Sequence, residues 1–148
     1  MSLSQLLQAE RIAILGQPQD GDLLLHTIAG LLADDADQQN VIAASLRQRE
    51  RLGSTSIGHG VAIPHGRSDV FDQARAAFVR LPAPVDYGAN DEEQVDLLFA
   101  LSVPAHFSHQ HLQILAEIAE RFSDESLRRA LREAEDIATL HALLVGPR

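Results

Sequence analysis

The chain has 148 residues, of which 45% are hydrophobic and 22% charged, enough for one domain with a buried core. A formal net charge of −9 argues against general nucleic-acid binding, because such proteins present a basic surface to phosphates. The chain has no cysteine, no signal-like N-terminus and no apolar run of the roughly 20 residues that a membrane span needs, so we expect a cytoplasmic protein.

The basic residues are all of one kind, since all 12 are arginine. Without lysine the chain cannot form a Schiff base or the Gly-Lys phosphate loop of Walker-type proteins. The glycine spacing of dinucleotide-binding loops and the Gly-x-Ser-x-Gly elbow of serine hydrolases do not occur either. The sequence offers imidazole instead, at His26, His59, His65, His106, His109, His111 and His141.

The first half of the chain predicts one strand and two helices. Residues 10–15 alternate apolar and polar side chains, as a half-buried strand does. A turn rich in Gly and Pro then leads to a helix for which Asp20 or Asp22 is the N-terminal cap. A second helix begins at about Gln38, carries apolar residues at helical spacing, and ends at Gly53.

The second half predicts three strands followed by three helices. The strands are expected at residues 61–63, 74–81 and 95–103, and the last is apolar on both faces, which suits a strand covered on both sides. The helices are expected at residues 108–122, 123–134 and 136–144. Together these elements predict a single α/β domain over residues 1–148, with a mixed β-sheet flanked by helices on both faces.

The most unusual stretch is "GSTSIGHGVAIPHGR", residues 53–67, which mounts His65 between Pro64 and Gly66. One interpretation is a strand-end turn in which the histidine is incidental. The other is a rigidly held, exposed imidazole whose free ring nitrogen attacks electrophilic phosphorus. His59, between two glycines, is read as a loop-edge residue.

Three histidines cluster around the start of the helix predicted after the apolar strand. His111 either points back over the end of the sheet, toward the Pro-His-Gly segment, or faces solvent as a capping residue. The spacing His106-x-x-His109-x-His111 resembles metal-ligand crowding, which leaves a histidine-based metal protein as an alternative. No carboxylate or fourth ligand is fixed by spacing, so we expect no metal.

Arginines end the second predicted helix. Arg47 and Arg51 share a helical face, whereas Arg49 points elsewhere. One of the three, placed beside the Ser54-Thr55 loop, would supply the planar fork that recognises a phosphoryl oxygen.

Residues 49–67 and 95–124 together resemble the fructose/mannitol-type EIIA domain of the bacterial phosphoenolpyruvate-dependent phosphotransferase system. The most similar subtype is the nitrogen-regulatory EIIA, and the resemblance covers nearly the whole chain. It implies an EIIA sandwich fold in which His65 carries the phosphoryl group on Nε2. It also implies that His111 is the second active-site histidine and that Arg49 is the family's active-site arginine, both donating to the phosphoryl oxygens.

The resemblance further implies a phosphoryl-binding cradle. Ser54, Thr55 and nearby backbone N–H groups would complete it, while Gly60 and Gly66 would keep the approach clear. The Nδ1–H group of His65 is expected to donate to a backbone carbonyl, which fixes the tautomer. No cofactor is expected, because the phosphohistidine donor is already activated.

The implied function is that of a phosphocarrier, a stoichiometric phosphotransferase component that accepts its phosphoryl group from an HPr-like protein. A chain with no attached EIIB or membrane segment favours the regulatory branch, in which regulatory target proteins are bound according to phosphorylation state. One alternative is a sugar-transport EIIA that passes phosphate to an EIIB domain. Another is a non-catalytic interaction module, against which the retention of the two histidines and the arginine argues. His59, where the family often has Asn or an acidic residue, and the additional His106 and His109 are mild departures.

Overall fold

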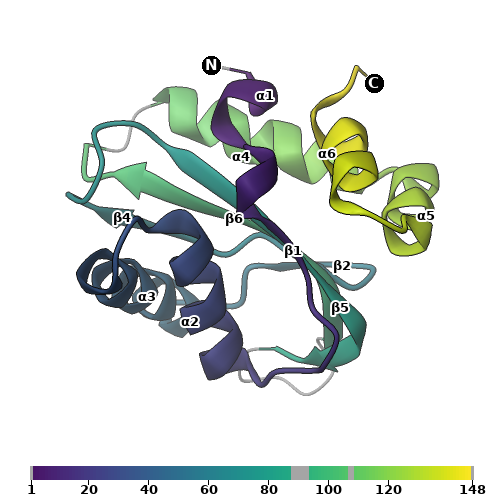
Figure 1. Ribbon diagram of the computed structural model, residues 1–148. Helices are drawn as coiled ribbons and strands as arrows, with labels where there is room; N and C mark the ends of the chain where they lie inside the picture. The colour runs from purple at the N-terminus through teal and green to yellow at the C-terminus, as the bar shows by residue number, and fades with distance from the viewer. Residues whose placement is uncertain (1, 88–93, 107–108, 148) are drawn as a thin grey trace.

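The computed structural model describes residues 2–87, 94–106 and 109–147, which form a mixed β-sheet between two layers of helices (Figure 1). Six strands of these residues make the sheet in the order β1-β5-β6-β3-β2, with β4 also paired to β6. They are β1 (Ile12–Ile14), β2 (Ser56–Gly58), β3 (Val61–Ala62), β4 (His65–Ser68), β5 (Arg75–Asp86) and β6 (Gln94–Pro104). The predicted mixed sheet with helices on both faces is therefore confirmed.

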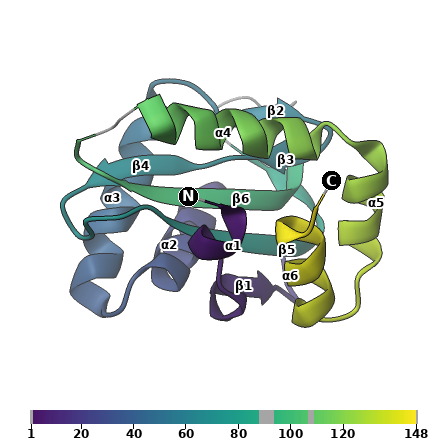
Figure 2. The same cartoon turned by 90° about the horizontal axis from the view of Figure 1, so that it is seen from above.

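The helices divide between the two faces of the sheet (Figures 1 and 2). On one face lie α2 (Gly21–Leu32) and α3 (Ala36–Arg51). The other face is covered by α1 (Leu3–Leu6), α4 (His109–Phe122), α5 (Glu125–Glu133) and α6 (Ile137–Val145). Each layer builds its own apolar core against the sheet, so the sheet is buried from both sides.

The strand β6 is the centre of the sheet. It pairs antiparallel with β5 along one edge, while β3 and β4 lie end to end along the other edge, both parallel to it. Leu97, Phe99 and Leu101 enter one core, and the alternate residues Leu98 and Ala100 enter the other. This alternation explains the continuous apolar run in the sequence, because a strand buried on both faces has no polar side.

The termini of several elements differ from the predicted ones. The first strand is shorter than residues 10–15, because Ala9–Arg11 form a 3-10 turn before it. The helix expected from Gln38 begins at Ala36, and the side chain of Asp35 caps it by accepting the N–H of Gln38. Of the two candidate caps for α2, Asp20 is the one used, since it accepts the N–H of Leu23.

Two strands and one helix were not predicted. The strands β2 and β4 are short and rich in Gly, Ser and His, so they lack the alternation that reveals a strand in sequence. The helix α1 has four residues, which is too short for a periodic signal. The expected start of α4 at Ser108 lies outside the described residues. The helix expected at 123–134 begins at Glu125, after the cap residue Asp124.

None of the helices in residues 2–87, 94–106 and 109–147 combines the length and the apolarity that crossing a membrane requires.

Candidate functional site

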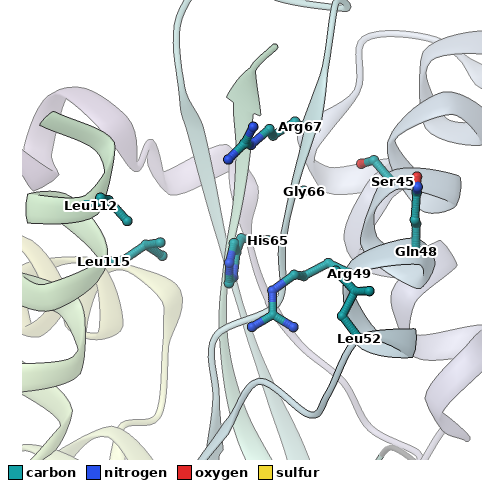
Figure 3. Close-up of a pocket in the computed structure, with 9 residues that line it drawn as sticks. All are labelled: Ser45, Gln48, Arg49, Leu52, His65, Gly66, Arg67, Leu112 and Leu115. Atoms are coloured by element: carbon teal, nitrogen blue, oxygen red, sulfur yellow. The ribbon is translucent and has the colours of Figure 1, made fainter. Parts of the chain in front are cut away.

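A cavity of about 510 Å³ opens at the free edge of β4, between α3 and α4 (Figure 3). The residues of β4 form its floor, α3 supplies one wall, and two leucines of α4 supply the other. In Figure 3 the guanidinium of Arg49 extends toward the ring of His65, and Leu112 and Leu115 face the ring from the opposite side. The cavity therefore surrounds the histidine of the Pro-His-Gly segment.

His65 is the first residue of β4, and its ring is held by the backbone before it. Its Nδ1 lies 2.9 Å from the carbonyl oxygen of Ile63. A carbonyl oxygen only accepts hydrogen bonds, so in the neutral ring Nδ1 carries the proton and Nε2 keeps a free lone pair. Between these two residues, Pro64 is anchored to the central strand, because its carbonyl accepts the N–H of Leu101 at 2.9 Å. The predicted backbone hydrogen bond of Nδ1 is confirmed.

The surroundings of this segment differ from the expected exposed turn. Pro-His-Gly is the beginning of an edge strand in register with β6, where His65 pairs with Leu101. The imidazole is half-buried rather than exposed. The reason is that β4 continues the line of β3 along β6, so the chain does not turn at the proline.

The electrostatic surroundings favour the neutral ring. Burial is the main cause that lowers the pKa of His65, because the charged imidazolium loses hydration. The Ile63 carbonyl raises this pKa, the positive charges of Arg49 and Arg67 lower it, and the negative charge of Glu50 raises it. The net effect is a pKa below the ordinary value of 6.5, so the ring is neutral at neutral pH.

A glycine is required at position 66 because α3 packs closely against β4 there. A Cβ atom at this position would lie 2.6 Å from Oγ of Ser45, 2.8 Å from its carbonyl carbon and 2.9 Å from its carbonyl oxygen. The backbone of α3 thus packs directly on β4, and the space beside Gly66 is filled by the helix. This corrects the expectation that Gly66 keeps the approach open. Because Arg49 follows Ser45 by one helical turn, the contact brings its side chain to the ring of His65.

Of the three arginines at the end of α3, Arg49 is the one that lines the cavity. Its Nη1 donates to the carbonyl oxygen of Gly53 at 2.9 Å, which holds the guanidinium near the loop after the helix. Arg47 forms an ion pair with Asp22 at 2.7 Å, and it lines a separate groove together with Arg51. The predicted division of these arginines between two faces is confirmed.

The hydroxyl-bearing loop residues lie beside the cavity but do not line it. Thr55 is buried, and both its hydroxyl and its N–H donate to the carboxylate of Glu50. The Oγ atom of Ser54 accepts the N–H of Ser56 at 3.1 Å. The structure therefore brings Arg49 and the Pro-His-Gly segment together, with these two residues in the supporting loop.

His111 is the third residue of α4 and is partly exposed. Burial, and then the charge of His106, lowers the pKa of His111. The α4 side chains that line the cavity are the next residue, Leu112, and Leu115. Leu112 is 52% exposed, because the buried face of α4 is formed by Ile114, Ile118 and Phe122. Arg67, which sequence reasoning missed, also lines the cavity.

The second predicted approach residue, Gly60, has a different role. Its φ is +81°, and a Cβ atom there would lie 2.6 Å from Nη2 of Arg132 and 2.8 Å from Oδ1 of Asp96. These two side chains form an ion pair at 2.9 Å, and Arg132 also donates to the carbonyl of His59 at 2.6 Å. Gly60 thus makes room for a structural ion pair between α5 and β6, which corrects the expectation of an open approach.

The arrangement suits attack on an electrophile that carries negative oxygen atoms. A neutral imidazole presents Nε2 to a cavity that two guanidinium groups, those of Arg49 and Arg67, also line. Guanidinium groups bind phosphoryl and carboxylate oxygens through paired, charge-assisted hydrogen bonds. The apolar wall from α4 and the exposed Leu52 at the end of α3 leave room for a partner surface at the cavity mouth.

Comparisons with known proteins agree with this chemistry. The family described as "Phosphoenolpyruvate-dependent sugar phosphotransferase system, EIIA 2" matches residues 5–145. A nitrogen regulatory protein of Bradyrhizobium diazoefficiens is 32% identical over 148 residues, which cover 99% of this chain and 97% of the relative. A fructose-specific EIIA component of Haloferax volcanii is 29% identical over 144 residues, covering 96% and 94%. The crystal structure of nitrogen regulatory protein IIA-Ntr from Neisseria meningitidis has a TM-score of 0.83 at 34% identity, covering 96% and 98%.

Gly66→Ala should lower the free energy of unfolding by about 1–3 kcal/mol, the usual cost of overpacking a tight contact. Adding Ser45→Ala should not restore the stability, because the added methyl group also meets backbone atoms of Ser45. Gly16→Ala is the matched control, since no atom lies within 4 Å of a Cβ there. Urea denaturation measures all three variants. Equal stabilities of the Gly66 and Gly16 variants would contradict the packing role.

Proposed function

The chain belongs to the type 2 EIIA family of the phosphoenolpyruvate-dependent sugar phosphotransferase system, and we propose that it is a phosphocarrier whose acceptor atom is Nε2 of His65. The observation that carries the proposal is the 2.9 Å contact between Nδ1 of His65 and the Ile63 carbonyl. It leaves Nε2 as the nucleophile, in a cavity that also contains Arg49.

The transfer needs no metal, redox partner or proton relay. The lone pair on Nε2 of His65 attacks phosphorus of a donor phosphohistidine in line with the bond that breaks. As the new N–P bond forms, the donor's N–P bond breaks, and its electron pair returns to the donor ring. The proton on Nδ1 of His65 stays in place, so one neutral imidazole and one phosphorylated ring exchange roles.

The neighbouring side chains stabilise the transferred group in this proposal. Arg49 keeps its Nη1 hydrogen bond to the Gly53 carbonyl and offers its other N–H donors to a phosphoryl oxygen, and His111 is the second donor, from the first turn of α4. Thr55 and Ser54 hold the adjoining loop in position, since Thr55 donates to Glu50 and the Oγ atom of Ser54 accepts the N–H of Ser56.

The partners are proposed from the same chemistry. The donor is an HPr-like phosphocarrier in the cytoplasm, whose phosphohistidine supplies an activated phosphoryl group. Phosphorylation adds roughly −1.5 to −2 charge beside the apolar cavity wall. We therefore propose that regulatory target proteins distinguish the two states. The regulatory branch is favoured by nitrogen regulatory relatives that match almost the full chain.

A second candidate, a sugar-transport EIIA, is favoured by the fructose-specific relative at 29% identity. The two candidates differ in the fate of the phosphoryl group. A transport component passes it rapidly to an EIIB protein, whereas a regulatory component retains it and changes its binding partners. Incubation of the phosphorylated chain with EIIB proteins therefore separates the two functions.

Incubation with phosphoenolpyruvate, enzyme I and an HPr-like donor should add one phosphoryl group per chain, measured by intact mass. The adduct should survive alkali and be lost in acid, as a nitrogen–phosphorus bond is. His65→Ala should fold and accept nothing, because it lacks the nucleophile. His141→Ala is the control, since His141 contacts the carbonyl of Leu7 in a different part of the fold. Stoichiometric labelling of the His65 variant would disprove the site.

The rate of phosphoryl acceptance should change little with pH above about 7 and should fall in more acidic solution. Burial lowers the pKa of His65 below its ordinary value, so the reactive neutral ring predominates at neutral pH and is lost by protonation as the pH falls. Single-turnover rates from a phosphorylated donor, corrected for the donor's own hydrolysis, give the profile. A rate that still rises between about pH 7 and 8 would show that the ring is protonated there.

A further inference from the structure

A carboxylate that the proposed reaction does not use belongs to the residue after Arg49, and it lines the neighbouring groove together with Tyr87. Glu50, in the last turn of α3, accepts hydrogen bonds on both carboxylate oxygens from buried donors. Its Oε1 accepts the hydroxyl of Tyr87 at 2.6 Å and also the hydroxyl of Thr55, while Oε2 accepts the N–H of Thr55 at 3.2 Å. Tyr87 is 1% exposed and Thr55 is 7% exposed, so this is a built polar cluster.

The placement of this carboxylate is unfavourable in itself. A negative charge in the last turn of a helix faces the negative end of the helix dipole. Burial is the main cause that raises the pKa of Tyr87, and the charge of Glu50 raises it further, so the phenol keeps its proton and donates. The three hydrogen bonds offset the cost of this charge. The hydroxyl groups of Thr55 and Tyr87 do not require a charged acceptor, because a neutral side chain could also accept their hydrogen bonds. The cluster therefore points to a task at the neighbouring site.

One branch of the cluster leads to the nucleophile. The carbonyl of Thr55 accepts the N–H of Ile63 at 3.1 Å. The carbonyl of Ile63 in turn accepts Nδ1–H of His65 at 2.9 Å. Glu50 therefore binds Thr55, and Thr55 binds the backbone of Ile63, whose carbonyl determines the tautomer of the His65 ring.

The other branch leads to the arginine. Gly53, two residues before Thr55, uses its carbonyl to hold Nη1 of Arg49 at 2.9 Å. Gly53 has a φ of +150°, and a Cβ atom added there would meet no other atom within 4 Å, so packing does little to restrain this residue. The N–H of Gly53 donates to the backbone carbonyl of Glu50 at 3.1 Å, and the bonds from Thr55 to the Glu50 carboxylate hold the other end of this short loop beside the guanidinium.

We propose that Glu50 is a positioning residue for phosphoryl transfer, which sets the Arg49 guanidinium and the His65 imidazole relative to each other through its hold on Thr55. This inference rests on the proposed phosphocarrier function of His65. Glu50 touches neither the ring nor the transferred group in this mechanism, and it acts through Thr55, whose two donors its carboxylate accepts.

The charge of Glu50 gives the inference a second, independent signature. The charged groups that act on the ring are Arg49 and Glu50 from α3 and Arg67 from β4, while α4 presents leucines and, beside them, His111. Glu50 is the group among these charges that raises the pKa of His65. A neutral replacement should therefore lower that pKa further, which an effect on stability alone would not do.

Glu50→Gln tests the proposal, with the single-turnover rate from a phosphorylated HPr-like donor and an NMR titration of the unphosphorylated His65 ring as readouts. We expect transfer to slow by about 10- to 100-fold in the folded protein, as misplacement of reacting groups typically does. We also expect a lower pKa of His65. Asp22→Asn is the matched control, because it removes the same charge from the partner of Arg47 and should change neither readout.

An unchanged rate and an unchanged pKa of His65 in folded Glu50→Gln, with only a lower melting temperature, would overturn the proposal. If that variant does not fold, Thr55→Val decides, because it removes the hydroxyl donor and keeps the charge. Slower transfer in this variant supports the positioning role, and a wild-type rate overturns it. The titration needs no phosphorylation, so a wild-type chain that accepts no phosphoryl group would refute the proposed function while leaving Glu50's effect on the ring measurable.

Discussion

The hydrogen bond from Nδ1 of His65 to the carbonyl of Ile63 is the interaction on which the site depends. It decides which ring nitrogen carries the proton and which keeps a lone pair, and its acceptor is a backbone carbonyl whose position no side-chain rotation can change. Pro64, between the two residues, restricts the backbone, and its carbonyl is bonded to Leu101 of the central strand. The orientation of the ring is thereby fixed by the most deeply buried part of the sheet.

The close contact of α3 with β4 supplies the other half of the site. Because Gly66 has no side chain, Ser45 packs on the strand, and Arg49 one turn later arrives at the ring. Its positive charge opposes protonation of His65, and in the proposed transfer the same charge would stabilise the phosphoryl group on the ring. Glu50, the next residue of α3, acts on the pKa of His65 in the opposite direction and accepts both donors of Thr55 in the loop after the helix.

Local sequence patterns predict many of the elements that form this site, but they do not predict the long-range contacts that hold them together. The apolar run of β6, the helix caps and the separate face of Arg49 follow from local patterns. The role of Gly66 does not, because it depends on which helix lies over the strand. The polar contacts of Thr55 are not readable either, because one of them is with the hydroxyl of Tyr87, which is distant in sequence. The wall from α4 also escapes prediction, since a shift of one residue in helix phase turns a side chain by about 100°.

The most direct test of the account is the identity of the phosphorylated nitrogen in the wild-type protein. Long-range proton–nitrogen NMR spectra of the phosphorylated chain distinguish the two phosphohistidine isomers. We expect phosphorus on Nε2 of His65, with Nδ1 still protonated and bonded to the Ile63 carbonyl. Phosphorus on Nδ1 would contradict this expectation, because that product requires the hydrogen bond to the backbone to be broken.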